Sequence, residues 1–306
     1  MLLLALASLL VTTPPVDTVV LHRYTATEAS YDVNAYWLES EGGVVVIDAL
    51  FLQADARLLA GMIRSTGKPL LGILLTHPHV DHFGGVPALR EAFPGVRLFA
   101  TAGTAAAIQA THDRGVAAGW LQAMMGEAGY GGPARVDSII ASGAELALGG
   151  MHFRVLDMGA AEAADNTIVH QRELDALFTG DLTVAHAPVY VGEGRPTELM
   201  EALARLRAQF PDSLTVYSGH YAAMPLGELV EANLAQLTAA RDIVRRVQGA
   251  PGARAANGTL TAPARREALG ALATLYRPLA RYGLSAEIMA AMNLPGLMAE
   301  HRAVAP

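Results

Sequence analysis

The sequence contains no cysteine among its 306 residues. Disulfide bonds and thiolate metal ligands are therefore both excluded, and no cysteine nucleophile is available. Any metal ion must instead be held by histidine, aspartate or glutamate. Such a ligand set suits zinc, manganese or iron and disfavours a structural zinc finger.

Positive charge is also scarce in this chain. It has 22 lysine and arginine residues against 29 aspartate and glutamate residues, and its formal net charge is −7. Phosphate binding needs basic patches, and no run rich in lysine or arginine occurs. The sequence thus argues against nucleic acid or an anionic membrane as a partner. We expect a small-molecule substrate, and the formation of a homodimer stays open.

The apolar run at residues 1–11 has the length of a signal-peptide core but is too short to span a bilayer comfortably. No basic residue precedes Leu2, so the charged start of a signal peptide is missing. Residues 1–15 are therefore interpreted as a truncated signal peptide or a hydrophobic N-terminus. We expect export to the periplasm or outside, with a cytoplasmic chain as the alternative, and no stable membrane insertion.

The densest chemical signal is the segment Thr-His-Pro-His-Val-Asp-His-Phe-Gly-Gly at residues 76–85, which directly follows the apolar stretch 70–75. In an extended segment His77 and His79 project to the same side, because side chains alternate along it. Asp81 and His82 are adjacent and diverge in direction, so they serve a different centre from His77 and His79. The spacing therefore fits two neighbouring metal ions better than one.

The remaining chain predicts α/β layering, with helices that cover the faces of sheets. Residues 103–134 interrupt the alternation and predict a helical insertion or flap, with plain surface helices as the alternative. The expected strands are residues 16–23, 34–39, 44–48, 70–75, 97–100, 145–148, 151–156, 166–170, 176–179 and 215–218. Helices are expected at residues 54–66, 86–92 and 197–208, and almost throughout from residue 226 onward, with a break at residues 249–259.

The His-x-His-x-Asp-His run resembles the signature of the metallo-β-lactamase-fold superfamily, and the likeness covers roughly residues 30–222. Asp181, after a predicted strand, resembles the aspartate that bridges both metals in that family, and His220 resembles its last histidine ligand. Asp48 matches a carboxylate that supports the metal-binding loops from behind, although a carboxylate in a turn is the alternative. The resemblance implies an αββα sandwich at residues 16–223, a helical C-terminal extension at residues 224–306, and two divalent metal ions.

One ligand position departs from the family pattern. Most members have a histidine where this chain has Glu162, four residues before Asn166. A glutamate at this point is similar to the alkylsulfatase-like branch, although the rest of those long enzymes is absent here. Glu162 is therefore expected to bind metal, with a degenerate site as the alternative. A carboxylate is a harder ligand than imidazole, so zinc stays the first expectation while manganese and iron gain weight.

Such a centre implies a hydrolase, because a metal-bridging hydroxide is available near neutral pH. Asp81 is expected to orient this hydroxide, and the substrate to contain an ester-like bond, as in a lactone, carboxylic ester, thioester or sulfate ester. The alternatives are β-lactam hydrolysis, or a redox or non-catalytic metal-binding protein of the same fold. Around the mouth of the site we expect Trp120, Tyr130, His186 and Tyr190, each of which also has an ordinary structural interpretation.

Overall fold

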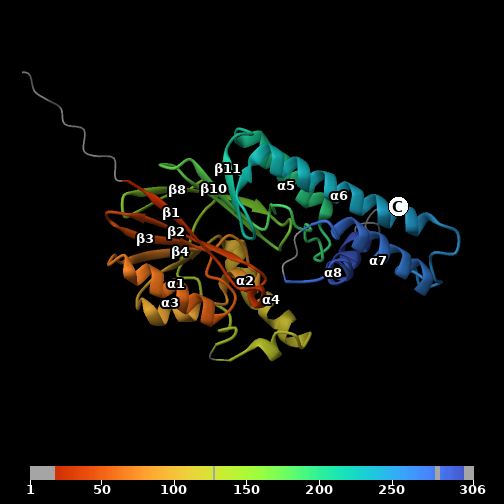
Figure 1. Cartoon of the computed structure of the whole chain (residues 1–306), viewed down its shortest axis with the longest axis horizontal. Helices are drawn as coiled ribbons and strands as arrows, with labels where there is room; N and C mark the ends of the chain where they lie inside the picture. The colour runs from red at the N-terminus through yellow and green to blue at the C-terminus, as the bar shows by residue number, and fades with distance from the viewer. Residues whose placement is uncertain (1–17, 127, 280–282, 300–306) are drawn as a thin grey trace, which may run out of the picture.

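Two mixed sheets face each other in the computed structural model, which describes residues 18–126, 128–279 and 283–299 (Figure 1). The first sheet has the strand order β1-β2-β3-β4-β5-β6, and the second has the order β12-β11-β10-β9-β8-β7. The first contains β1 (Val20–Thr25), β2 (Asn34–Ser40), β3 (Gly43–Ile47), β4 (Leu70–Leu74), β5 (Leu98–Ala100) and β6 (Ser138–Ile139). The second contains β7 (Glu145–Leu148), β8 (Met151–Gly159), β9 (Asn166–Gln171), β10 (Ala176–Gly180), β11 (Thr215–Ser218) and β12 (Met224–Pro225).

Helices occupy the connections between parallel strands, because such strands cannot be joined by a tight hairpin. Helix α1 connects β3 to β4, α2 and α3 connect β4 to β5, α4 connects β5 to β6, and α5 connects β10 to β11. Their bounds are α1 (Gln53–Ser65), α2 (Val80–Phe83), α3 (Val86–Ala92), α4 (Ala102–Ala117) and α5 (Pro196–Gln209). Two short 3-10 turns are η1 (Glu28–Ser30) and η2 (Gln122–Met124).

Strand β3 shows how the period-two pattern separates two hydrophobic cores. Val44 and Val46 pack in a cluster with residues of α1 and α3, whereas Val45 and Ile47 pack in a cluster shared with the second sheet. Because neighbouring side chains point to opposite faces of a strand, a continuous apolar run fills both cores. The first sheet is therefore covered by helices on one face and by the other sheet on its second face.

The second sheet repeats this arrangement with α5 and the long helix α6 (Leu226–Gly249) on its outer face. Leu177 of β10 packs in one cluster with Leu203 of α5 and Leu229 of α6. Phe178, the next residue, turns into the core between the sheets and lies 5.2 Å from the ring of Tyr36. The layers are thus helix, sheet, sheet, helix, and the predicted αββα sandwich is confirmed.

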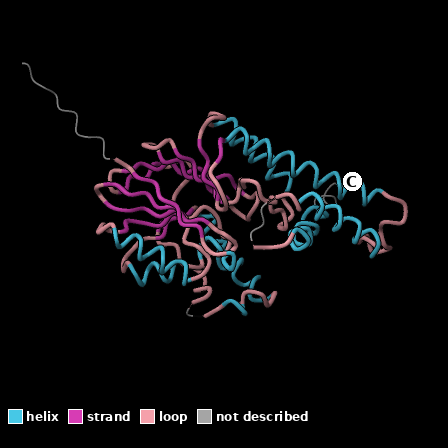
Figure 2. The backbone as a smooth tube through the Cα atoms, viewed as in Figure 1, coloured by secondary structure: helices cyan, strands magenta, loops and turns pink. Residues whose placement is uncertain are grey.

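The C-terminal extension is helical, as predicted, and lies beyond one end of the two sheets (Figures 1 and 2). It comprises the distal part of α6, α7 (Ala262–Tyr276) and α8 (Ala286–Ala299). One buried cluster continues from Leu177 of the sheet through α6 to Leu272 of α7 and Leu297 of α8. The extension and the sandwich therefore share a hydrophobic core.

Helix α4 forms the first part of the interruption predicted at residues 103–134, and η2 lies in the second part. The first turn of α4 is capped by Thr101, whose side chain accepts a hydrogen bond from the backbone amide of Thr104. The buried carboxylate of Asp165 accepts hydrogen bonds from the hydroxyls of both threonines, at 2.5 and 2.9 Å. A carboxylate at a helix N-terminus is also favoured by the helix dipole. Through these hydrogen bonds Asp165 connects α4 to the segment that carries Glu162.

The apolar N-terminal segment, residues 1–15, and the first two residues of the strand expected at 16–23 lie outside the described residues. The described part of that strand, β1, runs from Val20 to Thr25. Across the three described ranges, no helix combines the length and the apolar character needed to cross a membrane.

Three buried or half-buried amide side chains hold the loop at residues 181–195 against the C-terminal helices. Asn233 and Gln236 come from α6, and Asn293 comes from α8. Each side chain accepts a hydrogen bond from one backbone amide of the loop and donates one to a backbone carbonyl. The bonded loop residues are Val184 for Asn233, Val189 and Ala187 for Gln236, and Val191 and Val189 for Asn293. We call these three residues the amide clamp.

Replacement of Asn293 by leucine tests the amide clamp. The change leaves the Val191 amide and the Val189 carbonyl buried without their partner, and each such group costs about 1–3 kcal/mol. We expect Asn293→Leu to lower the free energy of unfolding by about 3 kcal/mol, measured by chemical denaturation. The exposed Gln209, at the end of α5, supplies the matched control Gln209→Leu, which should shift stability by less than about 0.5 kcal/mol. Equal effects of the two changes would contradict a role for the clamp.

Candidate metal centre

Seven candidate ligands come from the carboxyl ends of strands in both sheets. His77 and His79 follow β4 in extended backbone, and Asp81 and His82 lie in the first turn of α2. The other three each follow a strand: Glu162 after β8, Asp181 after β10 and His220 after β11. Strand ends at one edge of the sandwich therefore bring together residues that are up to 143 positions apart. The sequence had predicted all seven, and the structure places them in two adjacent groups.

The first group contains His77, His79 and Glu162. The Glu162 carboxylate is buried, and its Oε1 lies 3.3 Å from Nδ1 of His79. Its second oxygen, Oε2, lies 4.0 Å from Nε2 of His77. Glu162 thus occupies the position that the sequence assigned to it, with both oxygens directed at the two histidines.

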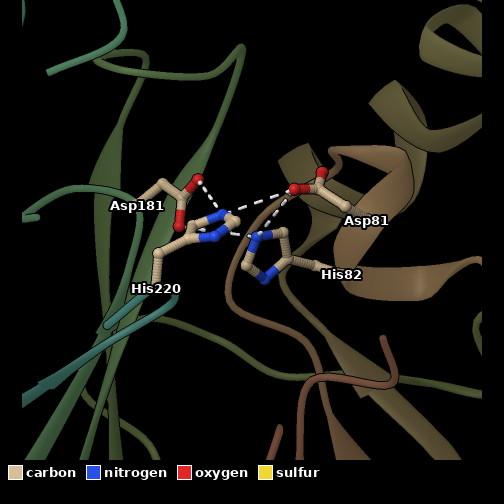
Figure 3. A group of neighbouring side chains, drawn as sticks. All are labelled: Asp81, His82, Asp181 and His220. Atoms are coloured by element: carbon tan, nitrogen blue, oxygen red, sulfur yellow. Dashed lines mark ion pairs between the residues drawn. The ribbon is translucent and has the colours of Figure 1, made fainter. Parts of the chain in front are cut away.

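The second group contains Asp81, His82, Asp181 and His220, whose side chains point toward one another (Figure 3). Nε2 of His82 lies 3.6 Å from Asp81 and 3.4 Å from Asp181. Nε2 of His220 lies 3.4 Å from Asp81 and 3.2 Å from Asp181. The division into two groups follows the one expected from the alternation of side chains in residues 77–82.

Several atoms in these groups are buried without a hydrogen-bond partner among the described residues. They are Nε2 of His77, Nε2 of His82, both carboxylate oxygens of Glu162 and Oδ1 of Asp181. An unpaired buried polar atom costs free energy, and a buried charge costs more. Imidazole nitrogens and carboxylate oxygens that converge in this way match the ligand preferences of zinc, manganese and iron. The residues present therefore fit the divalent metal ions that the fold implies.

Asp48 determines which nitrogen of two histidines is free to bind a metal. Its carboxylate accepts hydrogen bonds from the Thr76 amide, the Thr76 hydroxyl and Nδ1 of His82, all at 2.8–2.9 Å. Because the Thr76 hydroxyl uses its one hydrogen to donate to Asp48, it accepts a hydrogen bond from Nδ1 of His77. Both imidazoles therefore carry their proton on Nδ1 and direct the lone pair of Nε2 into the centre.

The other two histidines are oriented in the same manner by different partners. Nδ1 of His220 donates to the backbone carbonyl of Tyr31 at 2.8 Å, so Nε2 is the nitrogen that faces Asp81 and Asp181. Nε2 of His79 donates to Glu193 at 3.2 Å, so Nδ1 is the nitrogen that faces Glu162. Partners of this kind set the tautomer and the basicity of metal-binding histidines.

A third combination, Asp48 with His77 and His82, is close enough to hold a cation but is better explained as a support. The Asp48 oxygens already accept three hydrogen bonds, one of them from the protonated Nδ1 of His82. Asp48 also adopts a left-handed backbone conformation, with φ of 59°. Strained conformations of non-glycine residues gather where the surroundings require a particular side-chain position.

Glycine precedes two of the candidate ligands for steric reasons. Gly180, before Asp181, has φ of +52°, and a Cβ atom there would lie 2.3 Å from the Thr76 hydroxyl. A Cβ atom on Gly219, before His220, would lie 2.1 Å from a carboxylate oxygen of Asp181. Both positions therefore require glycine so that the ligand groups can approach each other.

Opposite charges balance one another within the centre. Burial would raise the pKa of the Asp181 carboxyl, but His220 and His82 hold it well below its usual range. Burial would lower the pKa of His220, whereas Asp181 and Asp81 raise it to about 9. Burial, helped by His82, holds the pKa of His77 well below its usual value. Metal binding replaces the imidazolium protons with a cation that fulfils the same electrostatic need.

A cavity of about 630 Å³ opens above the candidate ligands. Tyr190 and Trp120 line it, as the sequence suggested, and the Tyr190 ring lies 5.8 Å from that of His79. Tyr130 lies elsewhere, because it is buried among Phe51, Phe83 and His112, and its hydroxyl pairs with His112. His186 is exposed and is not among the described residues that line the cavity. The structure therefore brings two of the four expected residues to the site.

Glu193 is a site residue that the sequence did not indicate. It accepts from Nε2 of His79 and also pairs with Arg114 of α4 at 3.2 Å and with Arg195 at 2.7 Å. Burial would raise the pKa of Glu193, but His79 and Arg195 lower it to about 2. Because 114 residues separate Glu193 from His79, no local spacing could have signalled the contact.

Replacement of Glu193 by glutamine tests its support of His79. Loss of the charged acceptor weakens the orientation and basicity of the imidazole, and such changes lower metal affinity about 10–100-fold. We expect that loss for Glu193→Gln in a chelator competition titration. Glu173 pairs with His152 at 2.7 Å on the surface, so Glu173→Gln removes an equivalent pair away from the centre and should leave metal affinity unchanged. Unchanged affinity in Glu193→Gln would overturn the assignment.

Comparisons with known proteins agree with this geometry. The curated hydroxyacylglutathione hydrolase of Xylella fastidiosa (strain M23) is 28% identical over 197 residues, which cover 62% of this chain and 61% of that protein. The match thus spans about three fifths of that relative's length. A solved β-lactamase domain protein from Burkholderia ambifaria has a TM-score of 0.62 at 20% identity, and the alignment covers 92% of this chain and 84% of the other. TTHA1623, solved in a di-iron-bound form, has a TM-score of 0.53 at 26% identity, with 70% of this chain and 98% of the other covered.

The likeness to the Burkholderia protein concerns the fold alone and reaches into the C-terminal helices, because it covers most of the chain. The family profile described as the metallo-β-lactamase superfamily matches residues 31–220, which include all seven candidate ligands. That segment is more than half of the 306 residues. The chain belongs to the metallo-β-lactamase superfamily.

Proposed function

We propose that this protein is a hydrolase that cleaves an ester-like bond in a small molecule, as in a lactone, carboxylic ester, thioester or sulfate ester. The observation that supports this is the convergence of seven histidine, aspartate and glutamate side chains below one cavity, four of which carry buried nitrogen or oxygen atoms without a hydrogen-bond partner among the described residues. In this proposal His77, His79 and Glu162 hold one divalent ion. Asp81, His82, Asp181 and His220 would hold the other.

When bound by these residues, divalent ions would lower the pKa of a bound water toward about 7, so that no serine or cysteine nucleophile would be needed. The chain's own residues do the remaining work. Asp81 is half-buried at the cavity floor, where its carboxylate can accept a proton and orient the attacking oxygen. Burial raises the pKa of Tyr190, so its phenol keeps a proton that it can donate to a substrate oxygen.

The ester-like class is favoured over a β-lactam for two reasons. The relative named hydroxyacylglutathione hydrolase acts, by its name, on a thioester. The β-lactamase-like neighbour shares 20% of its residues and therefore supports only the fold. In addition, Glu162 in place of histidine makes the centre one charge more negative, which weakens its attraction for anionic substrates.

A test of the proposal combines a substrate panel with removal of one ligand. The panel contains nitrophenyl esters, a lactone, a thioester, an alkyl sulfate, a phosphodiester and a chromogenic cephalosporin. We expect turnover of at least one ester-like substrate, and we expect Asp81→Ala to abolish it while circular dichroism shows the fold intact. Asp242 is exposed on α6, so Asp242→Ala is the control and should retain full activity.

Three results would contradict this proposal. Turnover retained by Asp81→Ala would exclude the assigned centre. Hydrolysis of the cephalosporin alone would support β-lactam hydrolysis instead. Metal binding without turnover of any substrate would favour a redox or non-catalytic protein of the same fold.

Glu162→His tests how the unusual ligand sets metal preference. Carboxylate is harder than imidazole, so we propose that Glu162 shifts the centre from zinc toward manganese or iron. The di-iron form of one structural neighbour supports iron as a candidate. We expect Glu162→His to raise the zinc-to-manganese ratio about tenfold when both metals are offered equally and bound metal is measured by mass spectrometry. A conservative control, Glu162→Asp, should keep the wild-type preference. An unchanged ratio in Glu162→His would show that Glu162 does not set it.

A further inference from the structure

Two apolar walls flank the cavity above the candidate metal centre. Trp120 and Met124 form one wall, at the end of α4 and in η2. The second wall belongs to α8 and the residue pair before it, and comprises Leu284, Ile288, Met289 and Met292. His79, Asp81, Glu162, Asp181 and His220 contribute to the floor of the same cavity. A bound molecule that touches both walls therefore lies directly over the reacting centre.

Three large apolar side chains of the two walls are exposed. Ile288 is 47% exposed, Met292 is 40% exposed and Trp120 is 43% exposed. Ile288 and Met292 are four residues apart, so they form one stripe on α8. Large exposed apolar groups that gather at a cavity mouth mark a binding surface, because a ligand that buries them gains hydrophobic free energy.

The charged side chains that line the cavity, other than the candidate metal ligands, already form ion pairs. Apart from the candidate metal ligands, the charged side chains among its described lining residues are Arg114 and Glu193. These two pair with each other at 3.2 Å, and Glu193 also pairs with Arg195. A charged tail on the substrate would have to compete with these ion pairs. The cavity is therefore suited to an uncharged group.

Helix α8 is held in place as a wall of the cavity. Asn293 of the amide clamp bonds the backbone of Val189 and Val191, on either side of Tyr190. Gly296 lies so close to this loop that a Cβ atom would come within 1.8 Å of the Val191 carbonyl oxygen. Because α8 packs on the loop that carries Tyr190 and Glu193, the apolar wall and the catalytic floor form one unit.

We infer that the substrate is an ester-like molecule with a medium-length, uncharged acyl chain that lies between α4–η2 and α8. This inference rests on the proposed function and names its substrate class. The cavity volume of about 630 Å³ falls within the range of small-molecule sites, about 300–1,000 Å³. The ester carbonyl lies at the metal centre, and the chain extends past Met289 toward Ile288 and Met292.

A chain-length series tests this inference with the full-length, metal-loaded protein. The probes are p-nitrophenyl acetate, butyrate, hexanoate and octanoate, together with the p-nitrophenyl monoester of suberic acid, which ends in a carboxylate. A buried methylene is worth about a threefold to fourfold gain in binding. We expect kcat/KM to rise about 50-fold or more from butyrate to octanoate, and the suberic monoester to fall at least about tenfold below octanoate.

Two variants connect this preference to α8. Ile288→Gln and Met292→Gln should each lower the octanoate-to-butyrate ratio of kcat/KM by about fivefold to tenfold. Leu58 of α1 is 58% exposed and is not among the described residues that line the cavity, so Leu58→Gln is the matched control and should leave the ratio unchanged. Binding of the neutral fluorescent probe N-phenyl-1-naphthylamine gives a second readout that needs no turnover. The two α8 variants should weaken that binding, and the control should not.

The possible results separate this inference from the proposed function. Ester turnover without a chain-length preference, or an equal preference for the suberic monoester, would overturn the inference and leave the function standing. Probe binding that depends on Ile288 and Met292, without turnover of any ester, would support the apolar site and overturn the function. A chain-length preference that the α8 variants do not alter would overturn the proposed location of the chain.

Discussion

The convergence of buried imidazole and carboxylate groups at one edge of the sandwich is the constraint that orders the rest of this structure. Five atoms there are buried without hydrogen-bond partners, and each would destabilise the fold if nothing compensated it. Fixed acceptors hold the other ring nitrogen of each of the four candidate ligand histidines. The pair of Thr76 and Asp48 does so for His77 and His82, and Tyr31 and Glu193 do so for the other two. The protein thus orients the imidazole and carboxylate groups, and a bound cation would supply the electrostatic attraction that their unpaired atoms lack.

The sandwich and the C-terminal helices have different tasks in this arrangement. Strand ends of the two sheets deliver the ligands, because their geometry is set by the hydrogen-bonded ladders. The C-terminal helices reach the centre through the amide clamp and supply one wall of the cavity. The scaffold carries the ligands, and the appended layer shapes access to them. Because the two parts can change independently, one fold can support many substrates.

Glu162 takes part both in the candidate metal centre and in the cavity above it. It is a ligand candidate in the first group and also lines the cavity, so a single side chain contributes to both the charge of the centre and the floor of the cavity. A less positive centre beside apolar walls fits a neutral substrate better than an anionic one. The apolar stripe on α8 and the carboxylate at Glu162 are therefore consistent with each other.

The sequence by itself determined the fold class, the two groups of ligands and most strands and helices. These features rest on local periodicity and on spacing within short segments, such as residues 77–82, which backbone geometry translates directly into direction. Only the tertiary structure decided that Glu193 supports His79, that Tyr130 belongs to the core and that α8 covers the site. Those contacts join segments that are far apart along the chain. The packing of whole layers brings these segments together, and no local sequence pattern indicates that packing.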